Sequence, residues 1–355
     1  MRRIICLLLI MCMSVAFAYA EETDESVLIS FIGDCSIGDS AQYMDYESSY
    51  HTCLKNNGMA WPFSLVSDYL NKDDLTVANL EVVFTERRQH ADKVYYLKAL
   101  PENVQALSLG GIELVNTINN HSFDFFEEGY DDTLQVLTDA GIGHFGSYRV
   151  NSKDGYDHLA VKEIKGIRFG FVGFSYPQDS DQKRIAQRIE KLKNEEKCDI
   201  VVVSLHWGRE TYMTPESWQY KYAKQVMDAG ADVIWGHHPH VIQPIHFYQG
   251  KPILYSTGNF TFGTMSHVDP STGIFRLNFQ RNEEGKVQVT RLEVIPCETQ
   301  RSPDYRPFVL EDEAERKAVF KELRFKKDVY KYFDNLPESF LETGIVKLEN
   351  GMIIE

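Results

Sequence analysis

The stretch Val233-Ile-Trp-Gly-His-His-Pro-His240 joins a short apolar run to three histidines within four positions. An apolar run of this length, bounded by polar residues, is typical of a buried β-strand. Similar runs recur along the chain and alternate with segments whose apolar residues repeat at helical spacing. This alternation predicts an α/β fold with a mostly parallel sheet. The predicted strands are Val27–Ile32, Leu75–Ala78, Leu114–Ile118, Phe169–Phe174, Ile200–Leu205, Val233–Trp235 and Ile253–Tyr255, and the predicted helices are Pro62–Leu70, Pro101–Leu109, Glu128–Ala140, Gln182–Lys197 and Pro215–Ala229.

Residues that can bind a metal ion follow several of these strands at the same end. The carboxyl ends of parallel strands meet at one edge of a sheet, where open α/β proteins bind their ligands. Carboxylate and amide oxygens and imidazole nitrogens are ligands of zinc and of other divalent transition metals. The sequence therefore predicts a metal site of the kind that activates water in two-metal hydrolases. The residues at these ends are Asp34, Asn79, Glu81, Asn120, His121, Asp124, His206, His237, His238, His240 and Asn259.

Each of these residues also has a structural interpretation when it is taken alone. Asp34 follows a glycine, as turn residues often do, and Asn120 is suited to capping the next segment. A single His206 at a strand end is more often a hydrogen-bonded polar residue than a ligand. The clustered histidines are harder to explain in this way, because His-x-His places two imidazoles on one side of an extended segment that Pro239 stiffens. Five further histidines lack such a context and are interpreted as surface or packing residues, namely His51, His90, His144, His158 and His267.

The composition narrows the classes of partner and chemistry. The chain has 355 residues and a formal net charge of -15, so its average surface repels nucleic acid and disfavours a nucleic-acid binder. No phosphate-binding glycine loop and no G-x-S-x-G nucleophile motif occurs. Four cysteines follow residue 20, and their spacing is not that of a disulfide framework, although export would permit a Cys35–Cys53 bridge.

The first twenty residues have the features of a secretory signal peptide. Arg2 and Arg3 precede the apolar run Ile4–Phe17, and Ala18-Tyr-Ala20 matches a cleavage site. An uncleaved membrane anchor is the alternative, and both place the protein outside the cytoplasm at the cell envelope. Residues 25–300 are predicted to form one domain, in which short strand-like runs from 241 to 293 suggest a second, more antiparallel sheet. Residues 301–355 are charged and are predicted to form a mostly helical extension.

Six motifs occur in order along the chain, and together they resemble a known family. They are Phe31-Ile-Gly-Asp34, Ala78-Asn-Leu-Glu81, Asn119-Asn-His121-Ser-Phe-Asp124, His206-Trp-Gly-Arg-Glu210, Gly236-His-His-Pro-His240 and Tyr255-Ser-Thr-Gly-Asn-Phe260. Between about residues 27 and 297 the chain resembles the CapA family of capsule and poly-gamma-glutamate synthesis proteins. That family is similar to the calcineurin-like metallophosphoesterases. The resemblance thus implies a four-layer α/β/β/α sandwich with a site for two metal ions.

The resemblance also implies roles for individual residues. His121 matches the histidine that protonates the leaving group, and Asp124 is placed to orient its ring. The resemblance implies two further sets of site residues. The metal ligands are Asp34, Glu81 (alone or with Asn79), Asn120, His206, His238 and His240, and the residues expected to support these ligands or to contact substrate are Asn79, Arg209, Glu210, His237 and Asn259.

The sequence departs from the family pattern at the first two ligand positions. Ser36 stands in place of a histidine ligand, and Glu81 stands in place of the bridging aspartate. The loss of an imidazole is expected to weaken one of the two metal positions.

The function implied is that of an exported protein with a metal-dependent hydrolase-type site. It would act on an anionic cell-surface polymer or its precursor, with one or two Mn, Zn or Fe ions as cofactor. Its expected partners are membrane-bound subunits of a polymer synthase. Two alternatives stay open, namely a non-catalytic assembly or export factor and a metal-dependent hydrolase of amide or gamma-glutamyl bonds.

Overall fold

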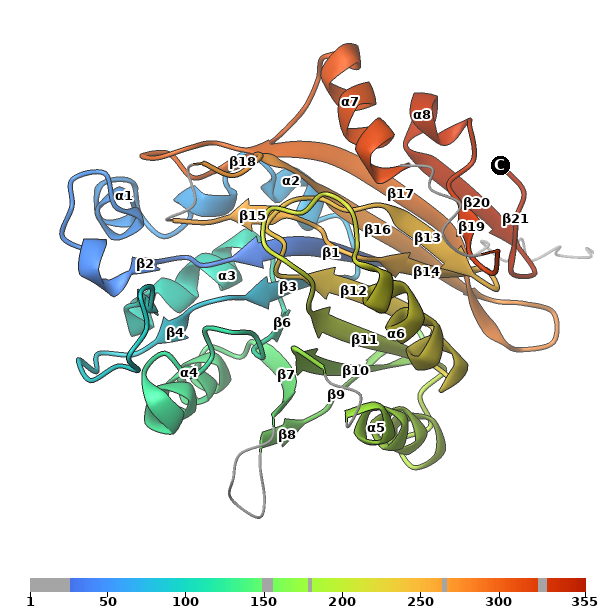
Figure 1. The fold of residues 1–355 in the computed structure, drawn as a ribbon, viewed down its shortest axis with the longest axis horizontal. Helices are drawn as coiled ribbons and strands as arrows, with labels where there is room; N and C mark the ends of the chain where they lie inside the picture. The colour runs from blue at the N-terminus through green and yellow to red at the C-terminus, as the bar shows by residue number, and fades with distance from the viewer. Residues whose placement is uncertain (1–25, 149–155, 178–180, 264–266, 325–330) are drawn as a thin grey trace, which may run out of the picture.

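A computed structural model describes residues 26–148, 156–177, 181–263, 267–324 and 331–355. It confirms a mixed α/β fold with several β-sheets (Figure 1). The finer prediction, a four-layer sandwich, stays a prediction. The expected signal peptide, residues 1–20, lies outside the described residues. No helix in the described ranges is long and apolar enough to cross a membrane.

The larger sheet is parallel at its centre and antiparallel at its sides. Across it run β21 (Met352–Ile353), β20 (Ile345–Glu349), β17 (Val287–Thr299), β16 (Ser271–Arg281), β1 (Val27–Cys35), β3 (Leu75–Leu80), β6 (Leu114–Asn116), β7 (Gly143–Tyr148) and β8 (Tyr156–His158), while β15 (Asn259–Thr261) pairs with β1 and β18 (Pro307–Val309) pairs with β17. The strands β1, β3, β6 and β7 are parallel to one another, and β16 and β17 run antiparallel beside β1. The carboxyl ends of the four parallel strands therefore share one edge.

The second sheet has the same organisation. Its order is β19 (Asp334–Asn335), β13 (Ile245–Tyr248), β14 (Lys251–Leu254), β12 (Val233–His237), β11 (Ile200–His206), β10 (Ile167–Ser175) and β9 (Ala160–Ile164). The strands β10, β11, β12 and β14 are parallel, whereas β9 and β13 are antiparallel to their neighbours. A small third sheet contains β2 (Asp39–Ser40), β5 (Leu97–Ala99) and β4 (Val83–Phe84).

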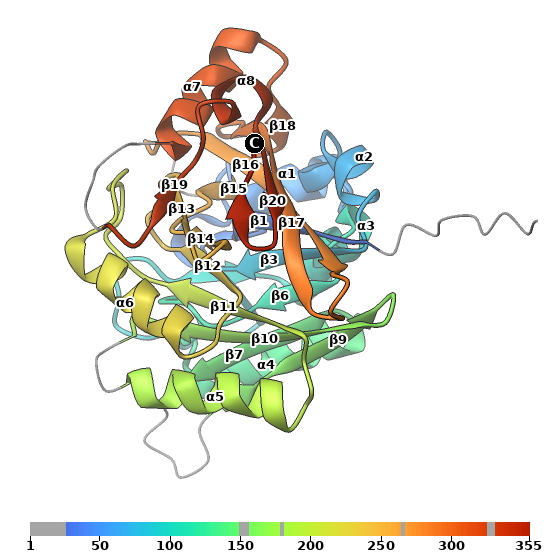
Figure 2. The ribbon, with the colours of Figure 1, turned by 90° about the vertical axis from the view of Figure 1, so that its right-hand side faces the viewer.

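Helices cover the outer sides of the two large sheets, and the two C-terminal helices pack against the apolar layer between the sheets. They are α1 (Tyr50–Asn57), α2 (Ser67–Leu70), α3 (Gln105–Gly110), α4 (Phe126–Asp139), α5 (Gln182–Asn194), α6 (Ser217–Asp228), α7 (Glu313–Leu323) and α8 (Phe340–Thr343), with 3-10 turns at Ala41–Tyr43, Trp61–Phe63 and Pro101–Val104. Figure 2 shows α5 and α6 along β10, β11 and β12, whereas α7 and α8 lie at the opposite end of the molecule.

Alternation of side chains along the strands creates the apolar layers. Phe31 on β1 and Trp235 on β12 point into the layer between the two sheets, where their ring centroids are 5.5 Å apart. The next residues on the same strands point the other way, because successive side chains of a strand face opposite sides. Ile32 packs in the layer that contains α1 to α4, and Ile234 packs in the layer that contains α5 and α6. The strands are thus buried on both faces, as their apolar sequences predict.

Each apolar run predicted as a strand overlaps a strand of the structure. Two predicted helices are shorter than expected, because 62–70 and 101–109 each combine a 3-10 turn with a short α-helix. The antiparallel strands after residue 241 do not form a sheet of their own. The strands β13 and β14 extend the seven-stranded sheet, and β16 and β17 extend the eleven-stranded sheet. The segment 301–355 is mixed rather than mostly helical, because β18, β19, β20 and β21 pair with strands of the two sheets.

Candidate metal centre

Strand register brings the polar strand ends together. In the larger sheet, Asp34 on β1 lies beside Asn79 on β3 and beside Asn259 on β15. In the other sheet, His206 at the end of β11 lies beside His237 at the end of β12. The two sheets pack against each other through a shared apolar layer, so these strand ends meet at one side of the molecule.

Two carboxylates and three imidazoles form the centre of the site. His237 Nδ1 lies 3.1 Å from Asp34 Oδ1, and His240 Nδ1 lies 3.5 Å from Asp34 Oδ2. His206 Nε2 and His240 Nε2 lie 3.7 and 3.8 Å from Glu81 Oε1. All five residues are buried. The cluster is therefore shielded from bulk water, where such charges would otherwise be solvated.

The cluster fits a divalent cation. Two sets of side chains, Glu81 with His238 and His240 and Asp34 with Glu81 and His206, have ligand atoms within 4.8 Å of one another. Among the described residues, the buried atoms Asp34 Oδ2 and Glu81 Oε1 have no hydrogen-bond partner. Buried polar atoms without partners are unfavourable, and a cation between them would satisfy them. Mixed oxygen and nitrogen donors suit zinc and divalent transition metals.

The protonation states favour metal binding by the imidazoles. Burial raises the pKa of Glu81 well above its usual value, and the negative charge of Asp34 adds to this effect. Burial acts on Asp34 in the same direction, but contact with His237 outweighs it and holds the pKa of Asp34 below its usual value. Burial lowers the pKa of His206, and it lowers the pKa of His238 to about 3. These imidazoles are therefore neutral, the form that binds a metal ion.

Asparagine side chains hold the ligands of the larger sheet in position. Asn79 Nδ2 donates a hydrogen bond of 2.8 Å to Asp34 Oδ1, and Asn79 Oδ1 accepts one of 2.8 Å from Asn116. Asn259 Oδ1 lies 2.8 Å from His240 Nδ1, which orients that ring. Asn79 and Asn259 thus hold Asp34 and His240 in place, and Asn116, which the sequence analysis did not single out, holds Asn79.

His121 lies at the edge of the cluster and is oriented by Asp124. His121 Nδ1 and Asp124 Oδ2 are 2.6 Å apart, so the other ring nitrogen of His121 faces away from Asp124. Lys93 Nζ contacts the second oxygen of the same carboxylate and donates a 2.8 Å hydrogen bond to the carbonyl of Asn120. The side-chain oxygen of Asn120 lies 2.8 Å from His206 Nε2. Lys93 therefore links the His121–Asp124 pair to Asn120 and through it to His206, a position for which the sequence gives no signal.

Ser36 does not take the place of the missing histidine. Its hydroxyl donates to Gly38 O at 3.0 Å and accepts from the amide of Gly263 at 2.9 Å, so both interactions hold the loop. His237, by contrast, contacts Asp34 directly. Its Nε2 has no hydrogen-bond partner among the described residues. The imidazole nearest to Asp34 thus comes from the histidine run rather than from the segment after β1.

The backbone of the histidine run is unusual. A Cβ at Gly236 would lie 2.0 Å from the carbonyl oxygen of Tyr255, so only glycine allows β12 to approach that segment. His238 and His240 then adopt φ angles of 97° and 59°. Non-glycine residues in this region cost about 1–3 kcal/mol each, and such conformations are concentrated at functional sites. The strain turns both imidazoles toward the cluster.

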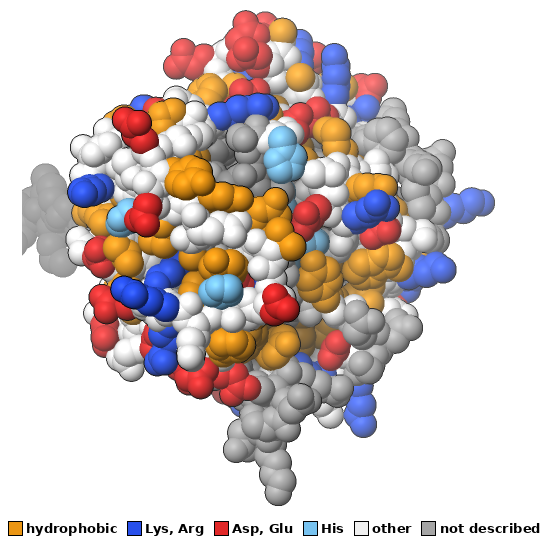
Figure 3. Space-filling model, turned by 60° about the vertical axis from the view of Figure 1, so that its left-hand side comes forward, with side chains coloured by type: hydrophobic (Ala, Val, Ile, Leu, Met, Phe, Trp, Pro, Cys, Tyr) orange, Lys and Arg blue, Asp and Glu red, His pale blue; other side chains and the backbone are white. Residues whose placement is uncertain are grey.

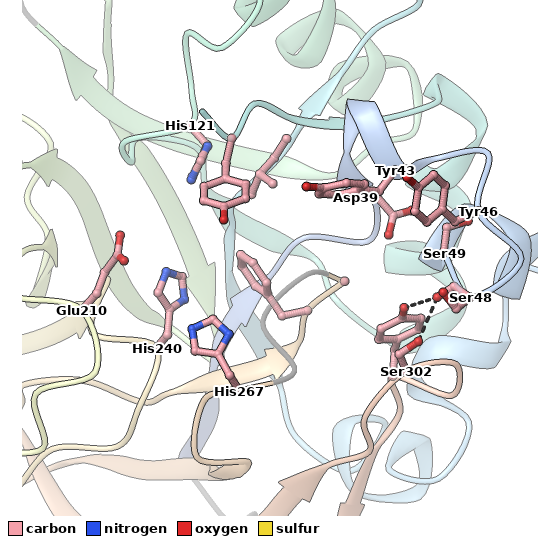
Figure 4. A pocket seen from close by; sticks show the side chains of 15 residues that line it. Asp39, Tyr43, Tyr46, Ser48, Ser49, His121, Glu210, His240, His267 and Ser302 are labelled. Atoms are coloured by element: carbon pink, nitrogen blue, oxygen red, sulfur yellow. Dashed lines mark hydrogen bonds between the residues drawn. The ribbon is translucent and has the colours of Figure 1, made fainter. Parts of the chain in front are cut away.

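A cavity of about 480 Å³ adjoins the cluster (Figure 4). His121, His240 and Glu210 lie on one side of it, and Tyr43 and Tyr46 lie on the opposite side. The cavity gives a ligand direct access to His121 and to His240. The cluster is therefore buried but reachable from this one cavity.

Three placements differ from what the sequence alone suggested. Glu210 lines the cavity, as expected of a substrate contact, whereas Arg209 is exposed and stacks 4.3 Å from the ring of Tyr212. His267 lines the cavity although its sequence context suggested a surface or packing residue. Tyr95 also lines it, from a loop without any strand-end pattern. These residues reach the cavity only when the chain folds, so no local spacing in the sequence predicts their position.

The cysteines take no part in the site. Cys35, Cys53, Cys198 and Cys297 are buried free thiols. A Cys35–Cys53 disulfide is absent, because Cys35 Sγ faces the carbonyl of Gly33 and Cys53 Sγ faces the carbonyl of Asp304. Burial also raises the pKa of Cys35 well above its usual value, which disfavours a reactive thiolate.

Comparison with known sequences places the chain in a family. The model of the family described as "Bacterial capsule synthesis protein PGA_cap" matches residues 28–264. The chain belongs to this family. The PGA_cap match runs from β1 to β15 and therefore includes every candidate ligand of the cluster.

Named relatives show how far the similarity extends. The "PGA biosynthesis protein CapA" of Bacillus subtilis is 26% identical over 317 residues, which cover 85% of this chain and 78% of the relative. The "Capsule biosynthesis protein CapA" of Bacillus anthracis is 31% identical over 261 residues, which cover 67% of this chain and 60% of the relative. A "Probable polyglutamine synthesis accessory protein" of Mycobacterium tuberculosis is 28% identical over 230 residues, covering 56% of this chain and 59% of the relative. The chain thus spans less than two thirds of the length of the last two relatives.

Proposed function

We propose that this protein is an exported component of capsule or poly-gamma-glutamate biosynthesis, with a metal-dependent hydrolase site at its strand ends. Membership of the capsule synthesis family and the names of the relatives support the pathway. One observation carries the site, namely the buried oxygens Asp34 Oδ2 and Glu81 Oε1, which face imidazoles and have no hydrogen-bond partner among the described residues. A divalent ion is the species that satisfies such a set.

Each side chain has a stated task in this proposal. Asp34, Glu81, Asn120, His206, His238 and His240 hold one or two ions. The chemistry that an ion supplies there is activation of water and polarisation of the bond to be cleaved. His121 presents its free ring nitrogen to the cavity and protonates the leaving group, and Asp124 holds the ring in that orientation. Lys93 holds the Asp124 carboxylate in place through its contact with the second carboxylate oxygen.

The finer features of the proposal concern the fold, the location and the partners. We assign the two sheets and their outer helices to a four-layer α/β/β/α sandwich. The apolar run Ile4–Phe17 directs the chain out of the cytoplasm, as a cleaved signal or as an anchor. The substrate is an anionic cell-surface polymer or its precursor, and the partners are membrane-bound subunits of the polymer synthase. The name of the mycobacterial relative, an accessory protein, is in keeping with such partners.

A non-catalytic role is the second candidate, and one observation favours it. Ser36 replaces a histidine ligand of the family pattern, and its hydroxyl is already engaged by Gly38 and Gly263. With one imidazole fewer, the cluster can serve as a stable platform for assembly or export rather than as a hydrolase. Hydrolysis of an amide or gamma-glutamyl bond uses the same groups as hydrolysis of a phosphoester, so the choice between these bonds is a matter for experiment.

The proposal is tested by metal content together with turnover. Elemental analysis of the purified protein after dialysis is expected to find one or two divalent ions for each chain. The same protein, supplied with Mn²⁺ or Zn²⁺, is then assayed with a chromogenic phosphodiester and with poly-gamma-glutamate. Turnover of either substrate identifies the bond. Bound metal without turnover of both substrates supports the platform, and a protein that binds no metal contradicts the proposed site.

A further inference from the structure

We propose that the tyrosine-lined end of the cavity binds an uncharged sugar unit, so that the ligand of this protein is a glycan or carries one beside the reacting group. The cavity has two chemically different ends. Figure 4 shows His121, Glu210, His240 and His267 at the cluster end, and the tyrosine end lies opposite. The labelled residues of the tyrosine end are Asp39, Tyr43, Tyr46, Ser48, Ser49 and Ser302. Tyr305 belongs to the same end, because its hydroxyl contacts the carbonyl of Ser48.

The tyrosine end offers nothing to a polyanion. No lysine or arginine among the described residues lines the cavity. The face of the protein drawn in Figure 3 likewise carries its Lys and Arg side chains in separate small groups rather than as one basic area. Binding of several carboxylates or phosphates depends on cationic side chains placed beside them. A run of polyglutamate is therefore a poor match for this end of the cavity.

A cation also lacks a partner at the tyrosine end. Asp39 is the carboxylate there, and it is already engaged, because its two oxygens accept hydrogen bonds of 2.9 Å from the amides of Tyr50 and His51. Burial raises the pKa of Asp39, in keeping with its enclosed position. The other carboxylate of the lining, Glu210, lies at the cluster end. Neither charge sign is thus favoured beside the tyrosines, which leaves a neutral ligand.

The tyrosines themselves indicate which neutral ligand fits. Tyr43, Tyr46 and Tyr95 line the cavity with 37, 58 and 54% of their surface exposed, which is unusual for large aromatic side chains. An aromatic face is electron-rich and attracts polarised C–H groups, whereas the phenol oxygen at its edge forms hydrogen bonds. A sugar ring has C–H groups on its faces and hydroxyl groups around its rim. Tyrosines therefore match both parts of a sugar, as rigid amphipathic contact surfaces do in other binding sites.

The mutual contacts of the aromatic residues support a preformed surface. Tyr43 and Tyr46 meet edge to face with ring centroids 5.4 Å apart. Tyr305 stacks on Tyr50 at 5.0 Å, and its hydroxyl donates to the carbonyl of Ser48. The ring positions are thus set before a ligand binds, which lowers the entropy cost of binding.

Only the assignment of the cluster as the reacting end rests on the proposed function. Binding of a sugar at the tyrosine end is tested separately. Calorimetric titration with a tetrasaccharide of N-acetylglucosamine, and with one of glucose, is done on chelator-treated protein and on the His206→Ala variant. Binding of one of these sugars is expected in both samples, because the tyrosine end needs no metal. Tyr43→Ala and Tyr46→Ala are each expected to weaken that binding by about fivefold to tenfold, and Tyr46→Phe is expected to retain most of it.

Tyr212→Ala is the matched control, since Tyr212 is 43% exposed but does not line the cavity. The sugar site is refuted if neither tetrasaccharide binds, or if Tyr43→Ala and Tyr46→Ala bind sugar as well as Tyr212→Ala does. It is also refuted if tetramethylammonium or a glutamate oligomer, rather than sugar, binds in a Tyr46-dependent way. A protein that binds sugar but has neither bound metal nor turnover would contradict the proposed hydrolase site. The sugar site would still be supported by that result.

Discussion

The histidines of residues 237–240 and His246 are close in sequence and all buried, but their surroundings have opposite character. His237 and His240 face the carboxylate of Asp34 at 3.1 and 3.5 Å. His246 stacks on Phe333 at 5.8 Å and lies 5.7 Å from the ring of Tyr220. Burial is therefore not what distinguishes a candidate ligand from a packing residue. The neighbours decide, because an imidazole among carboxylates can share a cation with them, whereas His246 lies among aromatic rings and has Asn335 as its hydrogen-bonding partner.

The largest effect is expected when a cluster ligand is removed. His206→Ala should weaken metal binding by more than about 100-fold, since loss of a mere supporting partner already costs about 10–100-fold. Metal content after dialysis against a weak chelator measures this loss. His246→Phe is the control, because it alters a buried histidine outside the cluster. Equal metal contents in the two variants would remove the distinction between the two histidine regions.

The next largest effect concerns His121, which lies at the edge of the cluster. His121→Ala should lower turnover by about 10²- to 10⁴-fold, the contribution typical of a general acid, while bound metal stays unchanged. Turnover of the substrate found by the assays above, together with metal content, separates these two quantities. If the variant loses its metal as well, His121 is a ligand and not the proton donor.

A smaller effect is expected for His237, which shares features of both regions. It contacts Asp34, but its ring also lies 4.0 Å from that of Trp235, edge to face. As a partner of Asp34 it should contribute about tenfold to metal affinity, so His237→Phe should weaken binding by that factor and remain folded. Metal titration of the variant and its thermal unfolding test both statements. Unchanged affinity would assign His237 to packing, like His246.

The smallest effect on the site is expected for His246, whose replacement alters only stability. Burial lowers the pKa of His246 from 6.5 to about 4. Below about pH 6.5, His246 binds a proton in the unfolded chain but stays neutral in the folded protein. The free energy of unfolding therefore falls as the pH falls. From about pH 7 to about pH 5 this one residue should cost about 2 kcal/mol.

His246→Phe removes that contribution, because phenylalanine has no titrating group and a similar ring shape. The difference in unfolding free energy between the variant and the wild type should therefore shift by about 2 kcal/mol in favour of the variant from about pH 7 to about pH 5. Urea unfolding at the two pH values measures it. A difference that does not change with pH would show that His246 is solvated in the folded state.

Local patterns in the sequence were enough to predict the strands that carry the site. Apolar runs such as Ile200–Leu205 mark strands because a strand buried on both faces needs continuous apolar residues. The polar residues at their ends, such as Asp34 and His206, could be grouped because parallel strands share an edge. This inference needs only strand direction, which the strand-helix alternation supplies.

Long-range pairing escaped the same reasoning. The segment 301–355 looks helical because it is rich in charge, yet β20 pairs with β17 and β19 pairs with β13, both much earlier in the chain. Pairing of this kind depends on which edge is left open once the sheets have formed. Lys93 and His267 were missed for a related reason, since each reaches the site from a loop whose residues have no periodic pattern.

The sequence by itself determined the α/β fold and the location of the candidate metal ligands at strand ends, because these depend on local periodicity and on chain direction. The tertiary structure alone decided which imidazole stands beside Asp34, that Ser36 is occupied by its own loop, and that tyrosines from distant loops line the cavity beside the cluster. The physical reason is that packing and strand register determine the contacts between segments far apart in the chain. Neither of them can be derived from a local pattern in the sequence.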